Sequence, residues 1–299
     1  MIDDILAKFD GAFAKNTIRA YRSDFIQYQT WCSENKLEPI PASADTMAMY
    51  VDYLSENNKS ATIRRRINSL GTVLKLSKNH DPTKDPEVIL ALKRMHRKIG
   101  RAQEQATPLT KSLLNQLLGR CDNSVMGIRN QVLLRLGYET MRRRSELCAF
   151  KFEDSCQAPN GKPAIKLNFS KTDQYGSGKL LPLSQELAAL IYKWGILVGG
   201  DGYILKSINR HGCVGSSLNP ASISTILKTL QEGLKSGTNE PPLSGHSFRV
   251  GAALDLLEQG EPLERIMLRG GWQTDSTAMK YLRNYDLLCK LANITPYST

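Results

Sequence analysis

Near the C-terminal end of the chain, side chains suited to phosphodiester chemistry occur at fixed intervals. His246 and Arg249 form a His-x-x-Arg motif. Trp272 follows 23 residues after Arg249, and Tyr281 follows nine residues after Trp272. Arginine presents a rigid fork of donors to phosphate oxygens, histidine exchanges protons near neutral pH, and a phenol can act as a covalent nucleophile. The pattern therefore predicts nucleotidyl transfer through a phosphotyrosine.

The spacing of these four residues resembles the signature of the tyrosine recombinase, or phage integrase, family. The flanking residues strengthen the resemblance, because His246 and Arg249 stand in Gly-His-Ser-Phe-Arg-Val-Gly-Ala-Ala and Trp272 ends Gly-Gly-Trp. Tryptophan at this position is typical of the Cre-type phage and plasmid recombinases. The resemblance implies a site-specific DNA recombinase that cleaves and rejoins DNA through a covalent 3′-phosphotyrosine intermediate and a Holliday junction. It also implies that neither a metal ion nor ATP nor another cofactor is needed.

An arginine-rich segment in the middle of the chain supplies a further match. The family has an Arg-x-x-Glu-Leu box at the end of an apolar helix, and Glu146 with the leucine after it identifies Arg143 as the arginine of this box. Arg142 and Arg144 are then its neighbours. The resemblance implies that Arg143 and Arg249 grip the scissile phosphate, where each donor group can contribute about 3–4 kcal/mol. Glu146 is expected to orient these side chains or to form an ordinary helix salt bridge.

The family also takes a lysine from a β-hairpin as the general acid for the leaving 5′ oxygen. Lys171 stands at the end of a strand-like segment, directly before a turn, and matches that lysine. Lys179 on the return strand is the alternative. A lysine beside a turn can also be a plain surface residue.

The remaining three catalytic positions have distinct expected roles. His246 is expected to exchange a proton with the tyrosine hydroxyl and to contact the phosphate. Trp272 can donate one hydrogen bond but cannot transfer a proton, so it stabilises phosphate or packs in a core. Tyr285 lies four residues beyond Tyr281 and is its alternative as nucleophile, but the interval from Trp272 selects Tyr281.

Composition agrees with a nucleic-acid partner. The 299 residues include 40 Lys and Arg against 29 Asp and Glu, which gives a formal net charge of +11. Such an excess favours an anionic partner, and the resemblance implies double-stranded DNA that carries a specific inverted-repeat target site. The six cysteines show no Cys-x-x-Cys spacing, so neither a metal site nor a disulfide framework is predicted. No apolar run approaches membrane-spanning length, so we expect a cytoplasmic protein, associated with the nucleoid in a bacterial host, and no membrane partner.

The first hundred residues predict a bundle of helices. Apolar residues recur at intervals of three and four over 17–35, Ser43 is placed to cap a second helix, a third covers 60–76, and Pro86 opens a fourth. The resemblance identifies residues 1–99 as a SAM-like core-binding DNA domain. Residues 100–109 lack an apolar period and are interpreted as the interdomain linker.

Residues 110–299 are expected to form the catalytic domain. Helical patterns begin near residue 111 and cover 128–138, and Asn219-Pro220 is typical of a helix start. The segments 163–169 and 179–182 are strand-like and flank a turn, which predicts a β-hairpin. The predicted fold class is therefore mainly α, with an N-terminal helical bundle and a C-terminal α+β domain that contains a small sheet.

Residues for DNA reading and for assembly follow from the resemblance. The N-terminal helices of the family enter the major groove, and the matching helix starts offer Arg19, Arg22, Arg64 and Arg65. Each of these could equally lie on a solvated face. The family's C-terminal helix docks into a neighbouring subunit, which assigns oligomer contacts to Leu287, Leu288 and Leu291. The implied assembly is a homo-tetramer on two DNA sites.

Two other functions share part of this pattern. A type IB topoisomerase or a telomere resolvase would use much of the same active site, but the helical N-terminal bundle argues against both. A catalytically silent, sequence-specific DNA-binding protein is the third possibility. The complete set of catalytic residue types argues against it.

Overall fold

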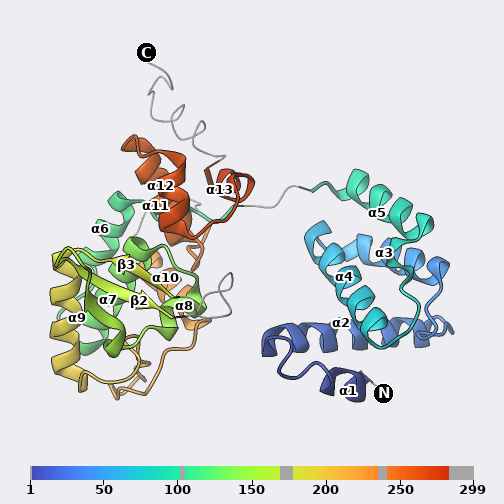
Figure 1. Cartoon of the computed structure of the whole chain (residues 1–299), viewed down its shortest axis with the longest axis horizontal. Helices are drawn as coiled ribbons and strands as arrows, with labels where there is room; N and C mark the ends of the chain where they lie inside the picture. The colour runs from blue at the N-terminus through green and yellow to red at the C-terminus, as the bar shows by residue number, and fades with distance from the viewer. Residues whose placement is uncertain (1, 102–104, 169–177, 235–240, 283–299) are drawn as a thin grey trace, which may run out of the picture. The chain divides into compact units, whose positions relative to one another are not determined.

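The computed structural model of the chain describes residues 2–101, 105–168, 178–234 and 241–282. The chain divides into two compact units, residues 1–104 and residues 105–299 (Figure 1). This division falls within the interval 100–109 in which the sequence places the linker. The part of that interval from Gln105 onward packs with the second unit.

Helices make up the described part of the first unit. They are α1 (Ile2–Ala7), α2 (Lys15–Glu34), α3 (Ala44–Asn57), α4 (Ser60–Leu76), the 3-10 turn Pro82–Lys84 and α5 (Pro86–Ile99). The predicted cap is confirmed, because the Ser43 hydroxyl accepts a hydrogen bond from the backbone N–H of Thr46 at 3.0 Å. The short α1 was not predicted, and it buries Ile2 and Leu6.

Aromatic side chains hold α2 against α3 in the core of this unit. The rings of Tyr28 and Tyr50 meet edge to face with their centroids 5.0 Å apart, and Trp31 lies 5.0 Å from Tyr50. Both tyrosines are fully buried. Rings of this size bury much apolar area and add a geometric preference, so they define how the two helices cross.

The second unit combines helices with one small sheet. Its helices are α6 (Lys111–Gly119), α7 (Val125–Thr140), α8 (Arg144–Ala149), α9 (Gln185–Val198), α10 (Ser222–Glu232), α11 (Ser247–Glu258), α12 (Leu263–Gly270) and α13 (Asp275–Leu282), with a 3-10 turn at Phe152–Asp154. The strands are β1 (Ser155–Gln157), β2 (Pro163–Leu167) and β3 (Lys179–Pro182). The mainly helical fold class with a small sheet is confirmed.

The predicted hairpin is the pair β2 and β3, extended by a third strand. The sheet order is β1, β2, β3, and both pairs are antiparallel. Leu167 lies opposite Lys179, so the strands are in register directly up to the turn. The exposed three-residue β1 was not predicted, because its side chains show no alternation of burial.

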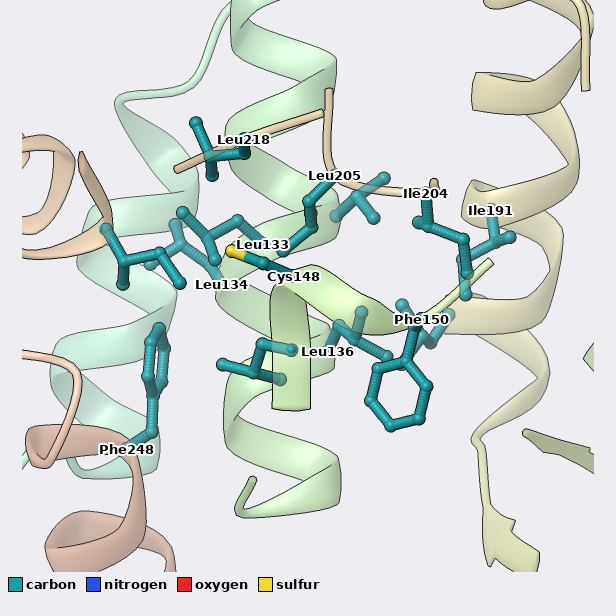
Figure 2. Close-up of a cluster of buried hydrophobic side chains, with 14 of the residues drawn as sticks. Leu133, Leu134, Leu136, Cys148, Phe150, Ile191, Ile204, Leu205, Leu218 and Phe248 are labelled. Atoms are coloured by element: carbon teal, nitrogen blue, oxygen red, sulfur yellow. The ribbon is translucent and has the colours of Figure 1, made fainter. Parts of the chain in front are cut away.

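The main core of the second unit ties α7 to the elements around it. Figure 2 shows Leu133, Leu134 and Leu136 from α7 meeting Cys148 from α8, Ile191 from α9 and Phe248 from α11. Phe248 packs so closely on α7 that a Cβ at Gly137 would lie 2.8 Å from its ring. The glycine therefore sets the distance between α7 and α11.

A second, smaller core brings the last three helices together. It contains buried residues of α11, α12 and α13, with Met141 at the end of α7 and partly buried Tyr281 packed against it. In Figure 1, α11, α12 and α13, toward the red end of the colour range, form this group. Because α11 belongs to both cores, the His-x-x-Arg motif lies on the helix that joins them.

The segment 105–109 runs along α11 as a strap. The backbone N–H of Leu109 donates to the Ser247 carbonyl at 3.0 Å, and a Cβ at Gly251 would lie 1.9 Å from the Leu109 carbonyl oxygen. At the start of the strap, the Gln105 side-chain amide donates to the backbone carbonyl of Tyr281 at 2.5 Å. The strap therefore contacts both the start of α11 and the end of α13.

Candidate active site

Arg249 lies in the first turn of α11 and is 1% exposed. Its Nη1 donates to the carbonyl of Met141 at 2.6 Å. Its Nε and Nη2 are buried and have no hydrogen-bond partner among the residues that the structure describes. Burial and then the charge of Arg143 lower the pKa of Arg249, while Tyr281 opposes this shift. Arginine stays protonated nonetheless, so two charged donors lack an acceptor.

Arg143 and Glu146 form one unit at the start of α8. Arg143 is the N-cap residue, its backbone N–H donates to Glu146 Oε2 at 3.1 Å, and its Nη1 donates to Oε1 at 2.9 Å. Burial opposes ionisation of Glu146, but the bonds from Arg143 outweigh it and hold the pKa of the carboxyl below its ordinary value. The Arg-x-x-Glu spacing is therefore a capping arrangement that aims a guanidinium with a buried carboxylate.

A tight corner after α12 presents Trp272. Gly271 is the C-cap with a left-handed φ of 66°, and a Cβ at Gly270 would lie 2.3 Å from the indole ring. The two glycines of Gly-Gly-Trp thus turn the chain and make room for the ring. The indole Nε1 is buried without a hydrogen-bond partner in the described structure.

Tyr281 on α13 completes a stack with Trp272 and Arg249. The centroids of its ring and the Trp272 ring are 4.9 Å apart. The guanidinium carbon of Arg249 lies 4.9 Å from the Trp272 centroid and 5.7 Å from the Tyr281 centroid. The fold therefore brings together residues that lie 32 positions apart in the sequence. Contacts between a cation and aromatic faces hold the three groups together.

His246 is the residue directly before α11 and is exposed. The side chain of His246, the N-cap residue, does not cap α11. The Ser244 hydroxyl instead accepts from the His246 backbone N–H at 3.3 Å. Desolvation of the ring by surrounding atoms, followed by the charges of Arg249, Arg144 and Arg143, lowers the pKa of His246. The imidazole is therefore neutral at neutral pH and able to accept a proton.

The lysine candidates differ in what the structure says of them. Lys171 lies outside the described residues. Lys179 opens β3, and its Nζ donates to the carbonyl of Leu268 at 2.5 Å. Burial and the nearby charge of Arg142 lower the pKa of Lys179. Lys179 thus has a structural partner, and Lys171 stays the prediction for the general acid.

Four further residues named from the sequence also lie outside the described part of the chain. They are Tyr285, Leu287, Leu288 and Leu291. The assignment of oligomer contacts to the three leucines therefore stays a prediction.

The arginines predicted to read DNA belong to the first unit and differ in their contacts. Arg64 and Arg19 are exposed, and Arg19 donates to the Asn16 side chain at 2.6 Å. Arg22 pairs with Asp3 at 2.7 Å on the surface. Arg65 binds both oxygens of Asp24, a carboxylate with only 2% of its side chain exposed.

The Arg65 ion pair gives this arginine a structural function. A buried carboxylate must keep its partner, because an unpaired buried charge is costly. Arg64 is exposed near the start of α4, and all four arginines stay predictions for a contact with DNA.

Sequence reasoning missed two residues that touch the site. Arg142 is 2% exposed, but it was assigned no role beyond that of a neighbour in the arginine run. Its burial beside a catalytic arginine is the signal that identifies it, and burial is not visible in the sequence. Gln105 was placed in the linker, and nothing in its local sequence indicates a bond to the carbonyl of Tyr281.

The assembled geometry describes a site for an anion next to a phenol. Three buried donor nitrogens, two on Arg249 and one on Trp272, have no acceptor in the described structure. An unsatisfied buried donor costs about 1–3 kcal/mol, so such a cluster is rare without a functional reason. A phosphate group has the charge and the oxygen geometry to satisfy these donors.

Family models place the chain. Residues 107–287 match the phage integrase family, and residues 8–77 match the N-terminal SAM-like domain of phage integrases. Because the first match covers more than half of the 299 residues, the chain belongs to the phage integrase family. It is an enzyme of the tyrosine recombinase class, which carries out site-specific recombination.

Individual relatives agree with this placement. The chain is 28% identical over 281 residues to an integrase/recombinase xerD homolog of Selenomonas ruminantium, across 90% of this chain and 82% of that protein. It is 25% identical over 294 residues to recombinase cre of Escherichia phage P1, across 92% of this chain and 86% of that protein. The predicted Cre-like character is therefore confirmed, and these relatives support neither a topoisomerase nor a silent DNA-binding protein.

Solved structures share the fold. A lambda integrase dimer bound to a COC′ core site matches with a TM-score of 0.66 at 15% identity, across 93% of this chain and 92% of that one. XerH recombinase bound to a palindromic difH substrate matches with a TM-score of 0.66 at 18% identity, across 93% of this chain and 79% of that one. Within the described residues, no helix is long and apolar enough to cross a membrane.

Proposed function

We propose that this recombinase breaks and rejoins a DNA strand by transesterification onto Tyr281. The observation that carries the proposal is the juxtaposition of the Tyr281 ring with three buried donor nitrogens of Arg249 and Trp272 that lack an acceptor among the described residues. A scissile phosphate bound by these donors would lie beside the phenol. Arg143, aimed by Glu146, would supply a further guanidinium to the same phosphate.

Residues of this chain would supply the nucleophile and both proton transfers of the cleavage step. The phenol oxygen of Tyr281 forms a bond to phosphorus, and the bond from phosphorus to the 5′ oxygen breaks. Neutral His246 takes the phenol proton, and Lys171 gives a proton to the departing 5′ oxygen. The arginines and Trp272 neutralise the charge that grows on the phosphoryl oxygens. Rejoining is the reverse reaction with a 5′ hydroxyl from the partner strand.

The proposed substrate is double-stranded DNA with an inverted-repeat target. Support comes from the net charge of +11 and from neighbours of the same fold that are bound to DNA, one of them a lambda integrase tetramer on a Holliday junction. By analogy, this chain would act as a homo-tetramer on two DNA sites. In this proposal, residues 1–99 bind the target, 100–109 link the domains, and Leu287, Leu288 and Leu291 contact a neighbouring subunit.

Covalent capture tests the proposal. A library of nicked duplexes with randomised cores is incubated with the protein in EDTA, stopped in detergent and separated on a denaturing gel. The wild type is expected to retain DNA as a covalent band that also yields the target sequence. Tyr281→Phe should remove the band, because the nucleophilic oxygen is absent.

Tyr285→Phe is the matched control for this experiment. It removes a second phenol from the same segment and should leave the covalent band in place. Loss of the band in both variants, or no band with the wild type, would refute the assignment of Tyr281. A wild-type band that forms when Mg²⁺ replaces EDTA, but not in EDTA, would refute metal independence.

A further inference from the structure

Arg142 is a buried arginine that the proposed chemistry does not use. It is 2% exposed and lies two residues beyond the end of α7, directly before Arg143. Its Nε donates to the Thr140 carbonyl at 2.7 Å, and its Nη2 donates to the Arg269 carbonyl. One guanidinium therefore donates to main-chain carbonyls at the end of α7 and near the end of α12.

The bond to Arg269 falls at the C-terminal end of α12. The last carbonyls of a helix have no partner within the helix and carry partial negative charge, so cations stabilise them. Lys179 Nζ binds the adjacent carbonyl of Leu268 at 2.5 Å. Gly271 faces the same guanidinium, since a Cβ there would lie 2.7 Å from Arg142 Nη1. Arg142 thus fills the space that the glycine leaves at the corner.

Two functional loops meet at this point. The loop from α7 to α8 carries Arg143, and its Met141 carbonyl accepts a bond from Arg249 at 2.6 Å. The corner from α12 to α13 carries Trp272 and leads to the nucleophile helix. Among the described residues, two side chains link these parts of the chain by hydrogen bonds. Arg142 donates to the Thr140 and Arg269 carbonyls, and the Arg269 side chain donates to the Glu139 carbonyl at 3.2 Å.

We propose that Arg142 is a positioning residue for strand cleavage, because its guanidinium holds the α12 to α13 corner with Trp272 against the loop that carries Arg143. This inference rests on the proposed function only for its kinetic consequence. Displacement of catalytic groups by about 1 Å can cost about 100-fold in rate. The tie therefore has a measurable effect without any contact between Arg142 and the substrate.

The charge of Arg142 belongs to the tie. Burial lowers its pKa to about 10, Arg249 and Arg143 act in the same direction, and Glu146 opposes them. The group is still protonated at neutral pH. Lysine at this position would keep the charge but could not reach two carbonyls in the geometry of the planar fork.

Hydrogen exchange without DNA tests the tie by itself. Peptides that cover residues 263–282 and 125–137 are followed by mass spectrometry in the wild type and in Arg142→Leu. We expect faster exchange over 268–282 in the variant, because the helix end loses its cation. Unchanged exchange over 268–282 would overturn the proposal.

Arg129→Leu is the matched control. Arg129 is a buried arginine of α7, 4% exposed, and its Nη1 donates to the Lys206 carbonyl at 3.2 Å, away from the site. This variant should loosen the region around residue 206 and leave 268–282 unchanged. Equal acceleration over 268–282 in both variants would show a general loss of stability and would overturn the tie.

Single-turnover kinetics test the consequence for cleavage. With the captured duplex at saturation, Arg142→Leu should form the covalent complex at least about 10-fold more slowly, and Arg142→Lys should recover part of the rate. The Kd for the duplex should change by less than about two-fold, because Arg142 does not touch DNA. A wild-type rate in Arg142→Leu, or a defect confined to the Kd, would overturn the proposal.

Two outcomes separate this inference from the proposed function. If the wild type forms no covalent complex, the proposed function fails, while hydrogen exchange still decides the tie. If Arg142→Leu does not fold, Arg142→Lys and Arg129→Lys are compared instead. A slower cleavage rate in Arg142→Lys alone supports positioning, and equal rates refute it.

Discussion

Single residues of the site combine deep burial with unused hydrogen-bonding capacity. Arg249 and Trp272 are 1% and 6% exposed, yet together they leave three donor nitrogens without an acceptor in the described structure. These donors are already oriented before any substrate arrives. Preorganisation of this kind favours the transition state, since no reorganisation is needed when charge develops.

Trp272 provides the first prediction at this scale. Trp272→Phe keeps an aromatic ring between Arg249 and Tyr281 but removes the indole N–H. We expect the covalent complex to form about 100-fold more slowly, because one oriented donor to the phosphate is lost. Trp272→His, which restores a donor, should lose less. If Trp272→Phe cleaves at the wild-type rate in single turnover, the tryptophan acts only by packing.

The pH dependence of cleavage reports on His246. Its pKa lies below the ordinary value of 6.5, so the neutral, proton-accepting form persists to lower pH than for a free imidazole. At DNA concentrations well below the Kd, where the profile reports the free enzyme, the rate should stay level from about pH 8 to about pH 6.5 and fall below that. His246→Gln should remove this acidic limb. A decline that begins above pH 6.5 would contradict the assignment.

Close approaches between backbone segments position the elements of the site. α11 joins the two cores of the second unit, and the strap 105–109 lies on it without room for a side chain at Gly251. Gly137 plays the same part where α11 meets α7. The position of α11 therefore depends on the absence of side chains at Gly137 and Gly251 as well as on its buried apolar contacts.

Gly251→Ala tests the packing of the strap. The new methyl group would lie 1.9 Å from the Leu109 carbonyl oxygen, so the strap or the helix must move. We expect the free energy of unfolding to fall by about 1–3 kcal/mol, as measured by urea denaturation. Gly119→Ala is the control, since a Cβ at Gly119 meets no atom within 4 Å and its effect should be at most about 1 kcal/mol. Equal effects in both variants would contradict the close approach.

At the scale of the molecule, positive charge is present in both units. The net charge of +11 favours binding to DNA, so binding should weaken as salt rises. The first unit carries exposed arginines on α2 and α4, while the second carries the buried ones of the site. We therefore expect affinity and catalysis to depend on different arginines.

Arg64→Ala tests this division. The slope of log Kd against log salt for the captured duplex should decrease by about one, because one phosphate contact is lost. The cleavage rate constant at saturating DNA should stay at the wild-type value. Lys193→Ala, an exposed lysine on α9, is the control for a change of net charge alone. The same change of slope in both variants would remove Arg64 from the interface.

Local sequence was sufficient for most elements and for the identity of the chemistry. Helix starts at Ser43 and Pro86, the end of α4 and the hairpin of β2 with β3 are encoded in neighbouring residues, because caps, prolines and apolar periods act over a few positions. The catalytic types and the interval from Arg249 to Tyr281 were likewise readable, since the family keeps that spacing along the chain.

Tertiary structure alone decided which arginine does what. The run 142–144 is uniform in sequence, yet Arg142 is buried against the α12 corner, Arg143 pairs with Glu146, and Arg144 donates to Ser224 at 3.2 Å. Packing also pairs Arg65 with the buried carboxylate of Asp24, a contact that its local sequence does not indicate. The physical reason is that burial and partners come from segments distant in the chain. The sequence shows directly which residues are charged. It does not show which distant residues accept their hydrogen bonds, because folding brings these together.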